Sequence, residues 1–181
     1  MRHFIKFLTL CFMASCKHPE KAPATYMNTI NQKLTPDYNN EFVFFADLSL
    51  SSSAYRFFVI RLKDSTIINR GLCCNGKTGK NGEVLYSNQP GSNCSSQGAY
   101  KIGAAYSGKF GKAFKLHGLD ATNSNAFSRN VVLHSYHGIP RKAYGLPICK
   151  SQGCPTVNPA YLEELATLIS KSNKPIMLYI Q

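Results

Sequence analysis

A cysteine in a tight polar turn and a histidine at the end of an apolar run are the residues of this sequence best suited to catalysis. The cysteine is Cys154, in Ser151-Gln152-Gly153-Cys154-Pro155, and the histidine is His134, which follows Val131-Val132-Leu133. A thiolate is a strong nucleophile, and an imidazole on a neighbouring strand can take the proton of the thiol. Gly153 lets the backbone approach a substrate carbonyl, so the amides of Gly153 and Cys154 can face a developing oxyanion. This arrangement predicts nucleophilic catalysis by Cys154.

Two histidines compete for the role of general base. His134 closes an apolar run whose alternation fixes the direction of its side chain, whereas His137 precedes Gly138-Ile139-Pro140 and is expected in a loop. A lone histidine in an apolar run is often only a buried structural residue. We expect His134 to be the base and keep His137 as the alternative.

The domain that positions these residues is predicted to be mainly β. Aromatic and β-branched runs at 42–48 and 55–62, joined by serine-rich turn residues, are typical of a hairpin. Residues 75–98 are rich in Gly, Asn, Ser and Pro and are predicted to form a long loop beside a substrate groove. Further strands are predicted at 65–74, 100–106, 113–119 and 130–136.

One helix is predicted after the cysteine. Asn158 is a good N-cap and Pro159 fits the first helical position. The apolar residues of the following turns lie on one helical face, and Lys174-Pro175 ends the helix before a closing strand at 176–180. The residues of that face are Leu162, Leu165, Ala166 and Ile169.

Residues 1–16 have the pattern of an export signal. Arg2 and Lys6 flank the start of an apolar run at 7–14 that is too brief to span a bilayer. The run ends at Ala14-Ser15-Cys16, which resembles the lipobox of bacterial lipoproteins, in which the cysteine is acylated. Cys16 is therefore predicted to anchor the protein to a membrane of the cell envelope, facing the periplasm. A cleaved signal that leaves a secreted soluble protein is the alternative.

The remaining chain is predicted to divide into two parts. Residues 17–40 carry three prolines and little periodicity, and are expected to be a flexible tether. Residues 41–181 are expected to be the catalytic domain. A chain of 181 residues with 44% hydrophobic content supplies one domain with a core.

Five of the seven cysteines lie after residue 16. An odd number in an exported protein fits one reactive thiol, Cys154, and up to two disulfides among the other four. Cys73 and Cys74 point to opposite faces of a strand and are not expected to bond to each other, while the other pairings stay open. The four are Cys73, Cys74, Cys94 and Cys149. No CxxC pair occurs, so no metal site is predicted.

The chain is strongly basic. Lys and Arg number 21 against 9 Asp and Glu, which gives a net charge of +12. Such a surface attracts anionic partners, or is only a solvated basic surface. The positive residues are scattered singly, and no nucleic-acid-reading motif is present, so nucleic acid is not predicted as a partner.

Several motifs along residues 42–181 resemble, in the same order, the L,D-transpeptidases of bacterial peptidoglycan. The resemblance is to the YkuD-like murein L,D-transpeptidase subgroup with Ser-x-Gly-Cys-Pro at the nucleophile. Lys150 and Cys149 depart from the Arg and Gly that the subgroup usually has before the serine. The matching stretches include Ser95-Ser96-Gln97-Gly98-Ala99-Tyr100, Tyr106-Ser107-Gly108-Lys109-Phe110-Gly111, Leu116-His117-Gly118-Leu119-Asp120 and Arg129-Asn130-Val131-Val132-Leu133-His134.

The resemblance implies a β-rich sandwich or barrel with one helix before the last strand. It also implies acyl transfer: Cys154 attacks a tetrapeptide stem to form a thioester, and an amine of a second stem resolves it as a 3-3 cross-link. His134 would be the base, held by the backbone carbonyl of Ser135, and Ser151 would support the loop. No cofactor is needed and a monomer is expected.

Contacts with the peptidoglycan stem peptides are expected from Ser151, Arg129, His117 and His137. Arg129 would bind a substrate carboxylate or form a structural salt bridge. His117 would pack in the fold or contact the groove. The same resemblance is compatible with two other functions. One is an L,D-carboxypeptidase or endopeptidase in which water resolves the thioester, and the other is a catalytically silent wall-binding lipoprotein.

Overall fold

The computed structural model describes residues 19–181. Within that range the chain forms nine strands and two helices. The prediction of a mainly β fold with a helix before the last strand is confirmed. The elements are α1 (Ala24–Lys33), β1 (Phe42–Ala46), β2 (Phe57–Arg61), β3 (Thr66–Gly71), β4 (Cys73–Cys74), β5 (Gly98–Gly108), β6 (Gly111–Gly118), β7 (Val132–Ser135), β8 (Thr156–Val157), α2 (Pro159–Lys171) and β9 (Met177–Ile180).

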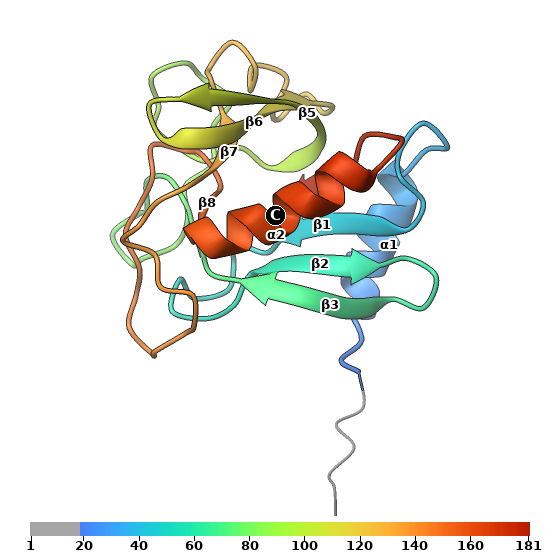
Figure 1. Cartoon of the computed structure of the whole chain (residues 1–181). Helices are drawn as coiled ribbons and strands as arrows, with labels where there is room; N and C mark the ends of the chain where they lie inside the picture. Colours follow the sequence, from blue (N-terminus) through green and yellow to red (C-terminus); the bar gives the residue numbers. More distant parts are fainter. Residues whose placement is uncertain (1–18) are drawn as a thin grey trace, which may run out of the picture.

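All nine strands belong to one sheet with the order β3-β2-β1-β9-β5-β6-β7-β8-β4. The last strand, β9, lies in the middle, parallel to β1 and antiparallel to β5. The sheet bends, so that β5, β6 and β7 lie above α2 while β1, β2 and β3 lie behind and below it (Figure 1). The strands β1 and β9, which are far apart in the sequence, are thus neighbours at the centre of the sheet.

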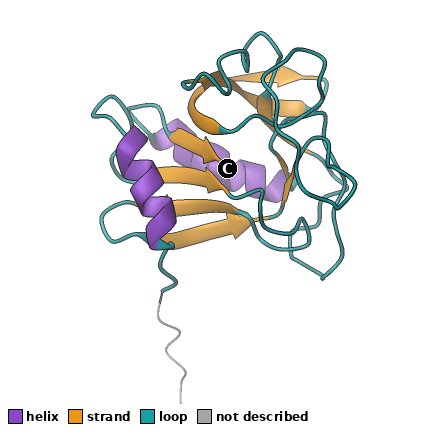
Figure 2. Cartoon of the chain, turned by 180° about the vertical axis from the view of Figure 1, so that it is seen from behind, coloured by secondary structure: helices purple, strands orange, loops and turns teal. Residues whose placement is uncertain are grey.

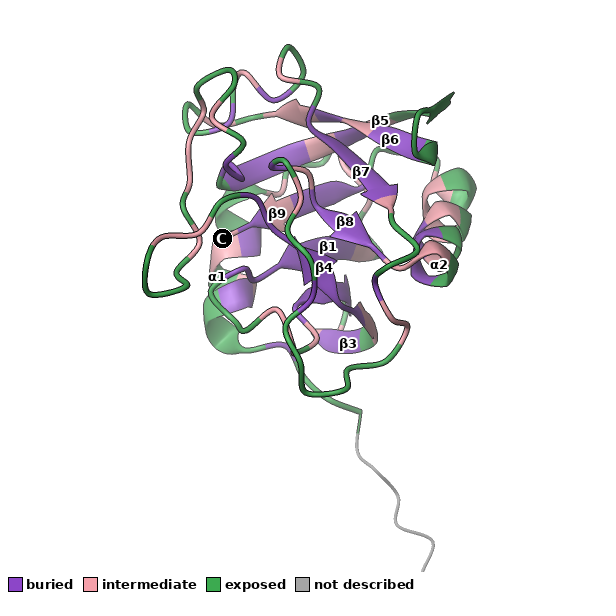
Figure 3. Ribbon diagram, turned by 90° about the vertical axis from the view of Figure 1, so that its left-hand side faces the viewer, coloured by how far each residue is buried: buried purple, intermediate pink, exposed green. Residues whose placement is uncertain are grey.

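The core has two parts, one on each face of the central strands. Alternate residues of β1 point to opposite faces. Phe44 and Ala46 join a cluster with the apolar face of α2 and with residues of β5, β6 and β7. Val43 and Phe45 join a second cluster with α1. Because both faces are covered, β1 is an apolar run with no polar alternation, and most of it is coloured as buried in Figure 3.

Helix α2 forms where the sequence predicts it. The Asn158 side chain accepts hydrogen bonds from the amides of Ala160 and Tyr161, and Pro159 occupies the first turn. Tyr161, which the prediction did not include, is fully buried with Leu162 and Leu165. The ring of Tyr161 packs edge-on against that of Phe57 at 5.9 Å between ring centroids. This contact joins α2 to β2.

Helix α1 contradicts the expectation of a flexible tether at 17–40. Its residue Ile30 is fully buried, and Tyr26 stacks on Phe45 of β1 at 4.1 Å between ring centroids. The Tyr26 hydroxyl donates to buried Asp47 at 2.5 Å. The helix covers the face of the sheet opposite α2 (Figure 2). Only two of its residues, Tyr26 and Ile30, are buried. The apolar periodicity of the segment is therefore weak, and the sequence did not predict a helix there.

This packing predicts that Ile30→Ala destabilises the domain. Removing a fully buried isoleucine side chain costs about 2–5 kcal/mol of the free energy of unfolding. Chemical denaturation followed by circular dichroism measures the change. Asn28→Ala, on the exposed side of the same helix, is the control and should change stability little. Equal stability of the Ile30→Ala variant and the unsubstituted chain would restore the tether interpretation.

The signal segment 1–16 and Cys16 lie outside the described residues. Among residues 19–181, neither helix is long and apolar enough to cross a membrane. The predicted strand at 65–74 is divided at Leu72 into β3 and β4. This division sends β4 to the far edge of the sheet, where it pairs with β8 beside the nucleophile.

Candidate active site

Cys154 lies two residues before β8, near the end of the long connection from β7. Its Sγ lies 3.5 Å from the amide of Val132, which donates to it, and 3.8 Å from the carbonyl oxygen of Asn130. The thiol is therefore held against the first residue of β7. Burial raises the pKa of Cys154 above its ordinary value, while the Val132 amide and the charge of Arg129 act in the opposite direction. The thiol form is therefore favoured at neutral pH.

The turn that carries Cys154 requires its glycine. Gly153 has φ +109°, and a Cβ there would lie 2.6 Å from the carbonyl oxygen of Cys94. Ser151 closes the turn, since its hydroxyl donates to the Cys154 carbonyl at 2.7 Å and accepts from the Gly153 amide at 3.1 Å. The Gly153 amide, expected to face an oxyanion, is thus occupied by Ser151. The amide of Cys154 has no hydrogen-bond acceptor within residues 19–181.

His134 lies on β7, in register with Thr156 of β8. Its Nδ1 is 3.0 Å from the backbone carbonyl oxygen of Ser135, the contact that the resemblance implies. A carbonyl only accepts, so Nδ1 carries the proton and Nε2 has the free lone pair. The nearest partner of Nε2 is the Thr156 hydroxyl at 3.0 Å, which must then donate to it. Both ring nitrogens of His134 thus have a hydrogen-bond partner, which fixes the orientation of the imidazole.

The imidazole of His134 is shielded from water. Phe110, at the turn between β5 and β6, stacks on it with 4.5 Å between ring centroids, and only 6% of the histidine remains exposed. Burial lowers the pKa of His134, and the hydrogen bond to Ser135 opposes this in part. The site therefore rests as a thiol and a neutral imidazole. No hydrogen bond joins these two groups within the described chain.

Thr156 is a site residue that the sequence analysis missed. It is buried, and its hydroxyl lies 3.0 Å from His134 Nε2 and 3.2 Å from the carbonyl oxygen of Cys154. The only sequence signal is that Thr156 stands two residues after the cysteine, on the same side of an extended segment. Its relation to His134 depends on the parallel pairing of β7 with β8, which local sequence does not reveal.

Within residues 19–181, Arg129 does not form the structural salt bridge that was one of its two predicted roles. Its guanidinium donates to the carbonyl oxygens of Ser87 and Cys94 at 2.7 and 2.8 Å, and to the hydroxyls of Ser92 and Ser96. Arg129 instead holds the loop 75–98 next to the turn that carries Cys154, because the carbonyl group of Cys94 also lies against Gly153 in that turn.

Of the histidines within residues 19–181, His117 and His137 lie apart from these contacts. His117 on β6 stacks on Phe127 at 4.8 Å between ring centroids, at the exposed side of the hairpin. His137 is exposed in the loop after β7 and makes no hydrogen bond in the part of the chain that is described. No group of three metal-ligating side chains occurs in that part either.

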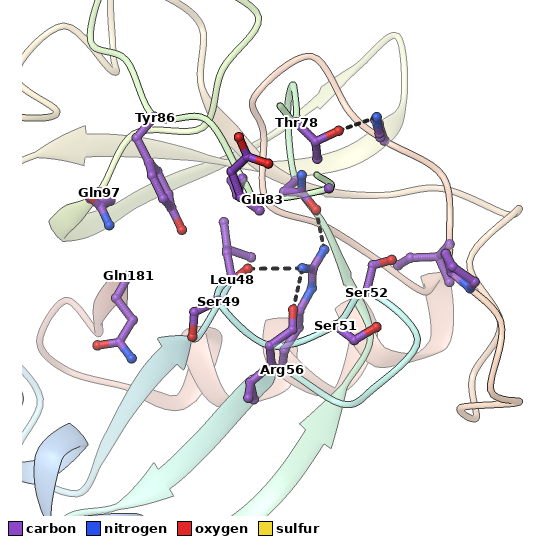
Figure 4. Close-up of a pocket in the computed structure, with 17 residues that line it drawn as sticks. Leu48, Ser49, Ser51, Ser52, Arg56, Thr78, Glu83, Tyr86, Gln97 and Gln181 are labelled. Carbon is purple, nitrogen blue, oxygen red and sulfur yellow. Dashed lines mark hydrogen bonds between the residues drawn. The ribbon is translucent and has the colours of Figure 1, made fainter. Parts of the chain in front are cut away.

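A cavity of about 650 Å³ adjoins the segment that leads to Cys154. Lys150 and Asn75 belong to its wall, and the amide of Ser151 donates to the carbonyl oxygen of Asn75 at 2.7 Å. Buried Arg56 forms its floor (Figure 4), with its guanidinium bonded to Asn75 and to backbone carbonyls. Residues of the loop 75–98 line this cavity, whereas Cys154 and His134 do not.

A family model described as L,D-transpeptidase catalytic domain matches residues 15–179. The chain belongs to the L,D-transpeptidase catalytic domain family. The match begins ahead of α1, in agreement with the packing of that helix on the sheet of this L,D-transpeptidase domain. Among the curated protein sequences, none matches the chain.

Several solved structures are similar to this L,D-transpeptidase domain. The helical cell shape determining protein Pgp2 from Campylobacter jejuni is 13% identical with a TM-score of 0.53, over 79% of this chain and 48% of Pgp2. An L,D-transpeptidase from Mycobacterium smegmatis is 13% identical with a TM-score of 0.45, over 78% of this chain and 58% of the other. One from Mycobacterium tuberculosis is 16% identical with a TM-score of 0.44, over 78% and 57%. The chain thus spans about half the length of Pgp2.

Proposed function

We propose that this domain is a peptidoglycan L,D-transpeptidase that works through a thioester on Cys154. The observation that carries the proposal is the placement of the Cys154 thiol against β7, the strand that also holds His134. The neutral imidazole favoured by burial is the form that can accept a proton. Membership of the L,D-transpeptidase family supports a peptide stem as the acyl donor.

In the first step Cys154 Sγ attacks the carbonyl carbon of the penultimate residue of a tetrapeptide stem. His134 Nε2 takes the thiol proton, and the tetrahedral intermediate places its oxyanion near the free amide of Cys154. His134 then returns the proton to the leaving D-alanine amine as the C–N bond breaks and the thioester forms. The amine of a second stem resolves the thioester to a 3-3 cross-link and restores the thiol.

Thr156 gives the imidazole a partner in both protonation states. At rest its hydroxyl donates to Nε2 of neutral His134. Once Nε2 is protonated, the hydroxyl can turn its proton to the Cys154 carbonyl oxygen, 3.2 Å away, and accept from Nε2. Hydrogen bonds to charged groups are stronger than those between neutral groups, so this exchange stabilises the imidazolium that forms during attack.

Thr156→Val is therefore expected to slow acylation. A hydrogen bond to a charged group contributes about 1.5–3 kcal/mol, which corresponds to roughly a 10- to 100-fold loss in the second-order acylation rate. Thr156→Ser keeps the hydroxyl and should retain most of the rate. Since valine cannot stabilise the imidazolium, the pKa on the acid side of the rate profile should move to lower pH. Unchanged rate and profile in Thr156→Val would contradict this role.

The activity itself is tested with disaccharide tetrapeptide as both donor and acceptor, with products separated by mass. A dimer linked 3-3 and released D-alanine are expected from the unsubstituted chain. A trimmed tripeptide alone would indicate the hydrolase alternative, in which water enters in place of the amine. No product under conditions where the chain is folded would overturn the enzymatic proposal and favour the silent wall-binding function.

We further propose that the protein is exported and lipid-anchored through Cys16. The support is the sequence Ala14-Ser15-Cys16 after a short apolar run. Acyl chains contribute about 0.8 kcal/mol of membrane binding per buried methylene, so more than one chain anchors stably. The protein should partition into the detergent phase, and Cys16→Ser should move it to the aqueous phase. An unsubstituted protein found entirely in the aqueous phase would support the secreted soluble alternative.

A further inference from the structure

Two cysteines outside the proposed catalytic machinery lie in contact. The Sγ atoms of Cys74 and Cys149 are 3.1 Å apart, although the residues are far apart in the sequence. Cys74 is buried in β4, whereas Cys149 is exposed in the connection that leads to Cys154. Of the five cysteines within residues 19–181, these are the two whose sulfur atoms contact each other.

The backbone around both cysteines holds them in this position. One residue after Cys74, the carbonyl of Asn75 accepts from the amide of Ser151, two residues after Cys149, at 2.7 Å. On the other side, Ile148 packs with Cys74 in a small buried cluster that also contains Leu72 and Ile139. The approach of the two sulfur atoms therefore results from main-chain pairing and apolar packing, and does not depend on one flexible side chain.

The other three cysteines have different surroundings. Cys73 Sγ lies 3.4 Å from the carbonyl oxygen of Cys74 and is fully buried. Cys94 Sγ lies 3.6 Å from the carbonyl oxygen of Ser92. Cys154 Sγ lies against the amide of Val132. A pairing of Cys74 with Cys149 thus leaves the proposed nucleophile as a free thiol.

We propose that Cys74 and Cys149 form a disulfide that ties the nucleophile turn, residues 149–154, to β4. Cys74 is the register partner of Thr156, and β4 pairs with β8. The bond would therefore fasten residues 149–154 at their start, while β8 already fastens them at their end. Such a turn holds the Cys154 thiol and the Thr156 hydroxyl at fixed positions relative to His134.

The oxidation requires an electron acceptor, which is a disulfide of a small thiol such as oxidised glutathione, or of a thiol oxidoreductase. The thiolate of exposed Cys149 attacks one sulfur of that disulfide, forms a mixed disulfide and releases the first thiol. Cys74 then loses its proton and attacks Cys149 Sγ, and the second thiol leaves. The two cysteines give up two protons and two electrons. Burial raises the pKa of Cys74, which favours Cys149 as the first to react.

Peptide mapping of the full chain tests the pairing. The chain is reduced, exposed to oxidised glutathione, alkylated and digested with trypsin. We expect peptide 71–77, alkylated once at Cys73, to be joined through Cys74 to peptide 143–150, with Cys149, at a mass lower by two hydrogen atoms than the sum of these two peptides. Cys94 and Cys154 fall in the separate peptides 81–101 and 151–171 and should be alkylated.

Matched variants assign the bond to one of the adjacent cysteines. Cys73→Ala should keep the linked peptides, whereas Cys74→Ala and the exposed Cys149→Ser should lose them. Linkage of 143–150 to 81–101 or to 151–171, or complete alkylation of both cysteines after oxidation, would overturn the proposal. Mapping needs no enzymatic activity, so a chain that forms this bond but does not acylate would contradict the proposed function alone.

The bond should also change thermal stability. A disulfide that closes a long loop restricts the unfolded chain, and a stabilisation of typical size raises the melting temperature of a domain of this length by roughly 5–10 °C. The oxidised chain should melt higher than the reduced chain by about that amount, and Cys149→Ser should show no such difference. An equal melting temperature in both redox states of the unsubstituted chain would refute the fastening of the turn to β4.

Discussion

Cys154→Ala is expected to abolish covalent acylation. Alanine has no atom that can attack a carbonyl, and the other described cysteines are buried or lie outside the contacts with β7 that hold Cys154. Incubation with a carbapenem, whose strained ring is opened by the same attack, should add one adduct to the unsubstituted chain and none to the variant. Intact-mass measurement reads the result directly.

A simple alkylating agent would not replace the carbapenem in this experiment. Burial raises the pKa of Cys154, whereas Cys149 is exposed, so a small reagent selects by accessibility and not by the catalytic site. Cys149→Ala, measured in the presence of a reductant, is the control and should still form one adduct. Persistent adduct formation by Cys154→Ala would mean that the nucleophile is another residue.

His134→Ala is expected to lower the second-order rate of acylation by about 10²–10⁴-fold at neutral pH. Burial raises the pKa of Cys154, so its thiol is protonated at neutral pH. Without a base, attack depends on the small fraction of Cys154 that is ionised at that pH. His137→Ala, in the exposed loop, should cost much less. Folding of both variants is checked by circular dichroism, and a larger loss in His137→Ala would move the base to His137.

The pH dependence of acylation provides a second reading of the same base. An imidazolium cannot accept a proton, so the rate should fall as the pH decreases through the pKa of His134. Burial lowers this pKa, so activity should persist to lower pH than an ordinary histidine would permit. In His134→Ala the inflection at the pKa of His134 should disappear, and the rate should instead rise with pH until the Cys154 thiol ionises, at higher pH because burial raises its pKa. An inflection that stays at the pH of the unsubstituted chain would mean that another group is the base.

Local chemistry in the sequence was enough for much of the domain. Asn158 and Pro159 predict the start of α2 because capping depends on side chains within one turn. Aromatic and β-branched runs predict most strands because both faces of the central sheet are covered. Helix α1 was missed because its stability comes from Tyr26 and Ile30 packing on β1, not from its own pattern.

For the site, the sequence was sufficient to predict the reactive residue types: a cysteine directly after a glycine, and a histidine that closes an apolar strand. It also supplied the serine that braces the turn. Only the tertiary structure brought in Thr156, turned Arg129 toward the loop 75–98, and placed Cys74 against Cys149. The contacts of Thr156 and Cys74 depend on pairing between β4, β7 and β8, strands far apart in the chain, and those of Arg129 depend on a loop that is distant in sequence, so no local pattern predicts them.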